Sequence, residues 1–357
     1  TFTGVTTNSL NLYINNGGQG NLVGSIDNVS VVEVLGEEIV PDSGTPTLLL
    51  EPQSTNLLTY SEDFSDAYWA KSDNPIVTLN YGISPSGENN SVRIQGNNST
   101  AIYHSGGFSA TDGRSIYVKA TSGSGNIQLL THNGNTDNVF SIDENWQRVE
   151  VNTSSSVPSL FYAVDMRGAA TDIFDIEIWG AQAEALSYAT SYIPTNGAIA
   201  TRLADSVTGA VSATTFNSTE GVLYAEMAAL ADGVGTRTMS LSDGSNNNSI
   251  TLRYTTSTGI LSSFIVAGGA IQFSANISGV SVLDFNKVAI KYSLNDMALW
   301  INGVEVATDT SGTMPSGLSE LNFTRGDGAN NFQGKVKDLR TYNTALTDAE
   351  LLTLTTI

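Results

Sequence analysis

Residues 297–307 read MALWINGVEVA, and this short stretch predicts a β-hairpin. Two runs of alternating apolar residues flank Asn302 and Gly303, the pair best suited to the two positive φ angles of a type I′ turn. The same period of two recurs outward along the chain, for example in residues 10–14 and 287–292, and clusters of Gly, Asn, Asp and Ser separate the runs. This pattern predicts an all-β protein built from tandem antiparallel β-sandwiches.

The overall composition agrees with this fold class and narrows the function. Charged residues make up 14% of the 357 residues, so Ser, Thr, Asn and Gly supply much of the polar surface. The absence of cysteine and the presence of only 2 histidines exclude a thiolate site and a histidine-rich metal centre. A net charge of −20 disfavours nucleic acid as a partner, and no apolar run long enough for membrane insertion is present.

Helical signal is confined to the C-terminal end of the sequence. Thr347 and Glu350 have the spacing of a capping box, and the apolar residues Leu351, Leu352 and Leu354 follow. One short helix is therefore expected there.

Several longer segments resemble parts of known protein domains. Residues 48–64 (LLLEPQSTNLLTYSEDF) and 178–184 (IWGAQAE) resemble the opening and the close of jelly-roll modules in bacteriophage structural proteins. These modules are similar to carbohydrate-binding modules of the calcium-containing β-sandwich type. Residues 221–226 (GVLYAE) and 332–351 (FQGKVKDLRTYNTALTDAEL) resemble the start and the end of a concanavalin A-like or laminin G-like sandwich.

The strand pattern and the resemblance together divide the chain into five parts. They are residues 1–36, the last strands of an incomplete upstream jelly roll; 37–55, a linker; 56–194, a carbohydrate-binding-module-like jelly roll; 195–215, a linker; and 216–357, the concanavalin A-like or laminin G-like domain. Because the sequence lacks an initiator Met and starts in a strand-rich segment, an upstream region is expected to be missing.

The resemblance implies a virion appendage protein of a bacteriophage, such as a tail fibre or spike, that is structural and adhesive rather than enzymatic. Its implied partners are other virion proteins, host-surface glycans and further copies of itself in a homo-oligomer, most simply a trimer. The apolar residues 47–50 and 193–194 would be exposed in a monomer; they are expected to lie between domains or subunits, or to pack the jelly roll onto its own neighbours. A secreted or surface-attached bacterial polysaccharide-binding adhesin, and a glycan hydrolase or lyase, stay open as alternatives.

Two carboxylates deserve comparison with catalytic pairs. Asp175 and Glu177 share one face of a predicted strand, about 7 Å apart, which is compatible with paired acid and base groups. Laminarinase-like sandwiches carry a further Glu two residues earlier, where this chain has Ile173. No catalytic residue is therefore assigned.

The resemblance to calcium-containing jelly rolls implies an ion site. It nominates Asp175 on the last strand together with Glu62 or Asp63 near the first strand, and Asp27 at the same place in the incomplete upstream domain. Oxygen ligands of this kind suit Ca²⁺, the only cofactor expected. The alternative is that these acids cap turns.

Aromatic side chains are the candidates for stacking on sugar rings. Tyr103 and His104 precede the polar residues 105–107 and are predicted to be the exposed pair that binds glycan. Three tryptophans are expected to fill the sandwich cores instead: Trp69, Trp146 and Trp179.

Overall fold

The computed structural model describes residues 47–107, 109, 112–130, 138–151, 160–207 and 216–357. The strands predicted within residues 1–36, and Asp27 among them, lie outside the described part. The described residues form two compact units, one of residues 47–51 with 205–357 and the other of residues 52–204. We call them the C-terminal sandwich and the inserted sandwich, because the second interrupts the sequence of the first.

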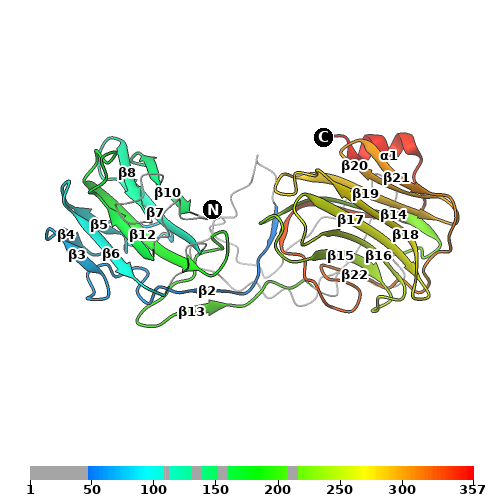
Figure 1. Ribbon diagram of the computed structural model, residues 1–357, viewed down its shortest axis with the longest axis horizontal. Helices are drawn as coiled ribbons and strands as arrows, with labels where there is room; N and C mark the ends of the chain where they lie inside the picture. Colours follow the sequence, from blue (N-terminus) through cyan, green and yellow to red (C-terminus); the bar gives the residue numbers. More distant parts are fainter. Residues whose placement is uncertain (1–46, 108, 110–111, 131–137, 152–159, 208–215) are drawn as a thin grey trace, which may run out of the picture. The chain divides into compact units, whose positions relative to one another are not determined.

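The inserted sandwich consists of two five-stranded antiparallel sheets and a two-stranded pair (Figure 1). The first sheet has the order β10 (Gln147–Val151), β7 (Gly113–Ala120), β12 (Asp175–Glu184), β5 (Val92–Gln95) and β4 (Ile76–Thr78). The second has the order β3 (Ala70–Ser72), β6 (Ala101–Ser105), β11 (Phe161–Asp165), β8 (Gly125–Leu129) and β9 (Val139–Ile142). The pair is β2 (Ser54–Asn56) with β13 (Ala200–Arg202).

The core of the inserted sandwich follows from the alternation along its strands. Ile176 and Ile178 of β12 and Val164 of β11 belong to one buried apolar cluster, while their sequence neighbours point to the opposite face of each sheet. Trp69 and Trp179 are buried as predicted. Trp146 is only half-buried, and its indole Nε1 donates a hydrogen bond to the Ile83 carbonyl oxygen.

The C-terminal sandwich packs a six-stranded sheet on a five-stranded sheet. The six-stranded sheet has the order β1 (Leu48–Leu50), β23 (Gly334–Tyr342), β14 (Glu220–Ala229), β19 (Asn286–Ser293), β20 (Met297–Ile301) and β21 (Val304–Asp309). The five-stranded sheet has the order β18 (Ala270–Ser278), β17 (Ile260–Ala267), β16 (Ser249–Tyr254), β15 (Arg237–Ser242) and β22 (Glu320–Asn322). The predicted hairpin is present as β20 and β21, with φ of 50° at Asn302 and 80° at Gly303. The all-β prediction is confirmed.

Helix α1 (Asp348–Thr355) covers part of the outer face of the six-stranded sheet, next to β19, β20 and β21 (Figure 1). Its capping box is formed as predicted, with the Thr347 side chain accepting from the Glu350 backbone N–H and the Glu350 carboxylate accepting from the Thr347 backbone N–H. Leu351 is buried against Ala298 and Trp300. Within the described residues, no helix has the length and apolar character needed to cross a membrane.

Both expected linkers contain strands. Residues 48–50, within the predicted linker 37–55, form β1 and pair with β23, and Leu50 is buried in the core of the C-terminal sandwich. Residues 200–202, within the predicted linker 195–215, form β13 and pair with β2. These ranges were expected to be linkers because their strands are short and their partners lie far away in the sequence.

Candidate functional site

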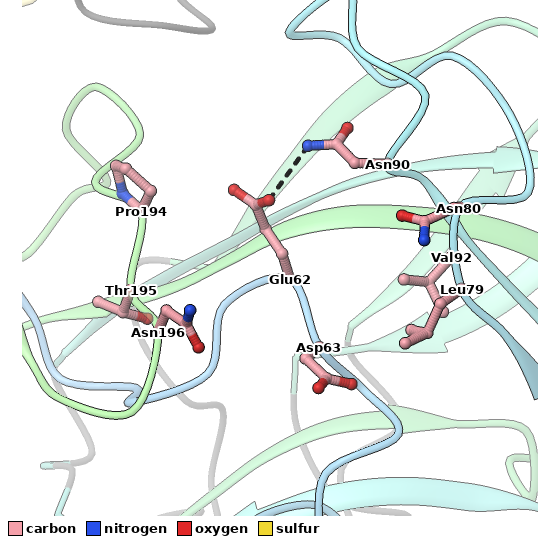
Figure 2. A pocket seen from close by; sticks show the side chains of 9 residues that line it. All are labelled: Glu62, Asp63, Leu79, Asn80, Asn90, Val92, Pro194, Thr195 and Asn196. Atoms are coloured by element: carbon pink, nitrogen blue, oxygen red, sulfur yellow. Dashed lines mark hydrogen bonds between the residues drawn. The ribbon is translucent and has the colours of Figure 1, made fainter.

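The inserted sandwich contains an open cavity of about 380 Å³. Its lining comes from three places in the chain: the segment after β2, the segment from β4 to β5, and the loop after β12 (Figure 2). The lining residues are Glu62, Asp63, Leu79, Asn80, Asn90, Val92, Pro194, Thr195 and Asn196. The volume falls in the range of about 300 to 1,000 Å³ that is usual for small-ligand sites.

The Glu62 side chain lies in the middle of this cavity, with residues 194–196 on one side and Asn80 and Asn90 on the other (Figure 2). One carboxylate oxygen accepts from the Asn90 amide at 3.1 Å, and the other accepts from the Tyr192 hydroxyl at 2.9 Å. Burial, followed by the charge of Glu62, raises the pKa of the Tyr192 hydroxyl, which therefore stays protonated and donates. These two donors fix the carboxylate and leave its remaining lone pairs facing the cavity.

Two further oxygen groups complete the polar lining. Asp63 Oδ1 accepts from the backbone N–H of Ser65 at 2.9 Å and from its hydroxyl at 2.6 Å, so this acid caps a turn. Thr195 is 8% exposed, and its hydroxyl is buried at the cavity wall without a hydrogen-bond partner. A buried hydroxyl without a partner costs free energy.

The lining has a definite chemical character. Carboxylates and amides alternate with a hydroxyl, Leu79 and Val92 add apolar surface, and no lysine or arginine stands among the described residues that line the cavity. Such a site favours a ligand that is rich in hydroxyl groups, donates and accepts hydrogen bonds, and carries no negative charge.

The carboxylates of β12 are engaged elsewhere. Asp175 forms a bidentate ion pair with the Arg93 guanidinium and accepts from the Thr121 hydroxyl at 2.9 Å. The Arg93 interaction is the main reason that the pKa of Asp175 lies below its ordinary value. Glu177 pairs with Lys119 at 2.9 Å and accepts from the Ser91 hydroxyl at 2.7 Å. Each of the two carboxylates is therefore held by a cationic side chain and a hydroxyl group.

The expected grouping of Asp175 with Glu62 and Asp63 is not seen. Asp175 is bound by Arg93, whereas Glu62 and Asp63 line the cavity together. In the part of the chain that the structure describes, no three His, Asp or Glu side chains lie close enough together to hold a metal ion. The calcium site nominated at Asp175 with Glu62 or Asp63 stays a prediction.

Tyr103 and His104 do not form one platform. Because successive side chains of β6 point to opposite faces, the Tyr103 ring meets Phe161 at a centroid distance of 5.8 Å, whereas the His104 ring stacks on Tyr68 at 3.8 Å. His104 Nδ1 also lies 3.2 Å from the Tyr68 carbonyl oxygen. Glycan binding by Tyr103 and His104 stays a prediction, and the stacking on Tyr68 covers one face of the His104 ring.

The sequence nominated Glu62 and Asp63 but not their neighbours in the cavity. Asn80, Asn90 and Thr195 lie in turns or loops, where such residues are expected for local reasons. The positive φ of 53° at Asn80 shows such a local role. Only the packing of three distant segments brings these groups together.

Comparisons with solved structures find matches of low identity. The carbohydrate-binding module CBM40 of the Ruminococcus gnavus IT-sialidase, bound to α2,3-sialyllactose, is 18% identical, with 43% of this chain and 96% of that chain covered and a TM-score of 0.35. A leech intramolecular trans-sialidase is 20% identical over 43% of this chain and 27% of its own, also with a TM-score of 0.35. Sheep galectin-11 is 11% identical over 39% and 99%, with a TM-score of 0.28. At these scores the likenesses add nothing to the choice of ligand.

Sequence comparison gives a family match for one part of the chain. No curated protein sequence matches the chain. Residues 204–352 match the family model described as the concanavalin A-like lectin/glucanases superfamily, which agrees with the resemblance seen in the sequence. The C-terminal sandwich is therefore similar to this superfamily over nearly all of its length.

Proposed function

We propose that the protein is a non-catalytic glycan-binding protein, and that the cavity around Glu62 holds an uncharged stretch of saccharide. The observation that carries this proposal is the lining of the cavity, where carboxylate and amide groups and the Thr195 hydroxyl surround a small apolar wall, with no lysine or arginine among the described lining residues. Sugar hydroxyls both donate and accept hydrogen bonds, and their C–H faces pack on apolar side chains such as Leu79. The lectin/glucanase match of residues 204–352 supports the same class of ligand.

The non-catalytic part of the proposal rests on the acids. The pair most like a catalytic one, Asp175 and Glu177, is bound by Arg93 and Lys119. In the cavity, Glu62 is already fixed by Tyr192 and Asn90. A hydrolase would need one carboxyl group free to donate a proton and a second to act as base or nucleophile.

The test is a glycan array followed by calorimetry on the glycans that bind. Glu62→Gln keeps the shape of the side chain and can still accept from Tyr192, but it removes the charge that strengthens bonds to sugar hydroxyls. Hydrogen bonds to a charged group contribute about 1.5 to 3 kcal/mol and those to a neutral group about 0.5 to 1.5 kcal/mol, so affinity should fall roughly 5- to 10-fold for each sugar hydroxyl bound.

Glu88→Gln is the matched control. Glu88 is exposed, lies in the same segment between β4 and β5, and does not line the cavity. Its variant should bind like the wild type. Equal affinity of the Glu62→Gln variant and the wild type would contradict the proposed site.

We also propose where the protein works. The resemblance of residues 48–64 and 178–184 to phage jelly-roll modules, followed by a concanavalin A-like or laminin G-like sandwich, supports a structural and adhesive role in a virion appendage that contacts host-surface glycans. A bacterial surface adhesin would use the same sandwiches. Mass spectrometry of purified phage particles and of bacterial surface fractions separates the two, since the chain should be found in the particles. Detection only on cells would favour the adhesin.

The appendage proposal includes a homo-oligomer, most simply a trimer. A chain of net charge −20 repels its own copies, so association must rest on apolar surface and backbone pairing. Light scattering should give three times the chain mass of 37.6 kDa for a trimer. A monomeric mass at micromolar concentration would contradict this part of the proposal.

A further inference from the structure

A second and larger cavity lies within the C-terminal sandwich, between the outer face of the six-stranded sheet and helix α1. Its volume is about 760 Å³, and we call it the helix-side groove. Its floor comes from β14, β19 and β23, and its wall from the helix and the turn before it. The lining residues are Tyr224, Glu226, Lys287, Asp338, Arg340, Tyr342, Leu346, Ala349, Glu350, Thr353 and Leu354.

Glu226 occupies the centre of the floor. It is the direct cross-strand neighbour of Lys287 on β19 and of Asp338 on β23, so three charged groups form one row across the sheet. Neighbouring strands are about 4.8 Å apart, which places these side chains within reach of a single small ligand.

The two neighbours of Glu226 are engaged with other groups. Asp338 is held by the Arg340 guanidinium, with Nε donating to Oδ1 at 3.0 Å. Lys287 Nζ donates to the Thr356 carbonyl oxygen at 2.9 Å. Glu226 is half-buried, and among the described residues its carboxylate has neither an ion pair nor a hydrogen bond. The Glu226 carboxylate is therefore an open hydrogen-bond acceptor at the floor of the groove.

Tyr224 and Arg340 supply donors beside this acceptor. The Arg340 guanidinium lies 5.7 Å from the centre of the Tyr224 ring. Burial, with the charges of Asp338 and Glu226, raises the pKa of Tyr224, so its hydroxyl stays protonated. Acceptor and donor groups therefore alternate over the floor of the groove.

The wall is apolar and the total charge is small. Leu346, Ala349 and Leu354 face the floor across the groove, and Thr353 adds a hydroxyl. Three acids and two bases line the groove, which disfavours an anionic ligand. A ligand that fits has hydroxyl donors for Glu226 and an apolar face for the leucines.

We propose that the helix-side groove is a second binding site for a neutral saccharide, in which the Glu226 carboxylate accepts hydrogen bonds from sugar hydroxyls and the apolar wall of α1 packs against the ring. This inference rests on the proposed glycan-binding function and adds a site that is separate in sequence from the Glu62 cavity. The protein is thereby bivalent, with one saccharide site in each sandwich.

The experiment compares full-length variants on the same glycan array, with calorimetry on every glycan that the wild type binds. Glu226→Gln removes the unpartnered charge. Thr353→Trp fills the groove from an exposed position of α1, so it keeps the proposal testable if Glu226→Gln perturbs the sheet. Glu305→Gln, at an exposed position of β21, is the control with the same charge change. Glu62→Gln reports on the other site.

Both groove variants should bind one set of glycans at least tenfold more weakly than the wild type. If both sites bind the same glycan, the number of saccharides bound per chain should instead fall from two to one. Glu305→Gln should bind like the wild type. The signals lost should persist in Glu62→Gln. If both groove variants bind every glycan as the wild type does, the proposal of a second site is wrong. The proposed function would still hold in that case, provided that Glu62→Gln loses binding. If the wild type binds no glycan, the proposed function and this inference are both wrong.

Discussion

Leu50→Ala tests the assignment of residues 47–51 to the C-terminal sandwich. Leu50 is 3% exposed and belongs to the apolar core that includes Met227, Phe332 and Val336. It lies on β1, whose backbone pairs with β23 from Leu48 opposite Val336 to Leu50 opposite Gly334. Truncating this side chain therefore removes core packing from a sandwich whose other residues come almost entirely from beyond residue 204.

The size of the effect follows from the burial of Leu50. Replacing a buried Leu with Ala costs about 2 to 5 kcal/mol, and a site on a three-residue edge strand should lie near 3 kcal/mol because the neighbours can relax. For a unit of this size, that free energy corresponds to a fall in Tm of roughly 6 to 12 °C. Leu49→Ala is the matched control, since Leu49 on the same strand is 37% exposed and its truncation should cost less than about 1 kcal/mol.

Hydrogen exchange measured by mass spectrometry separates the two sandwiches in the full chain. Amides of β14 and β23 that exchange through global opening should exchange about a hundredfold faster in Leu50→Ala, because each 1.4 kcal/mol is worth about tenfold. Amides of β7 and β12 in the inserted sandwich should keep their protection. Faster exchange in β7 and β12, with β14 and β23 unchanged, would refute the assignment.

Three further predictions concern the turn, the ion pair and calcium. Gly303→Ala should destabilise the C-terminal sandwich by about 1 to 2 kcal/mol, because φ is 80° and the new Cβ would lie 3.2 Å from Thr356 Oγ1; chemical denaturation with an unchanged midpoint would contradict this. Arg93 lowers the pKa of Asp175 below its ordinary value of 3.8. The ion pair therefore stabilises the inserted sandwich fully above pH 3.8, and this stabilisation is lost as the pH falls through the lowered pKa. The Tm of the inserted sandwich should therefore fall less steeply with decreasing pH in Asp175→Asn than in the wild type. The same dependence of Tm on acidic pH in both proteins would count against the ion pair. The calcium hypothesis, with Asp175 and Glu62 or Asp63 as ligands, predicts that calcium raises the Tm of the inserted sandwich and that Asp175→Asn abolishes the rise. A Tm that responds neither to calcium nor to chelator would contradict the hypothesis.

The sequence predicted the elements whose signals are local. The turn at Asn302 and Gly303 and the cap formed by Thr347 and Glu350 depend on residues at most four apart, and both are present in the structure. The strand β1 could not be predicted in this way, because three leucines give no period and their partner, β23, lies at the other end of the chain.

The candidate site was predictable only in part, for a related reason. The acidic character of Glu62 and Asp63 is visible in the sequence, and both line the cavity. Asp175 was nominated beside them from the same kind of evidence, yet its carboxylate is taken by Arg93 of the adjacent strand β5. Asp175 and Arg93 form a diagonal pair, because Asp175 stands opposite Gln95 and Glu177 stands opposite Arg93. The register that brings these opposite charges together is a tertiary property that the sequence does not show.

The connection between the sandwiches also explains how one fold tolerates another within its sequence. At residue 51 the chain leaves the C-terminal sandwich and at residue 205 it returns, and these two points are joined by two hydrogen bonds, from Glu51 N–H to Asp205 Oδ2 at 2.8 Å and from Asp205 N–H to the Glu51 carbonyl oxygen at 2.9 Å. Within the inserted sandwich, β2 near its first residue and β13 near its last residue pair directly with each other. Insertion of a domain is tolerated where the two ends lie close together, because neither fold then has to stretch to accommodate the other. The β1 edge strand can therefore pair with β23 although a complete sandwich with its own core separates β1 from the rest of its sheet in the sequence.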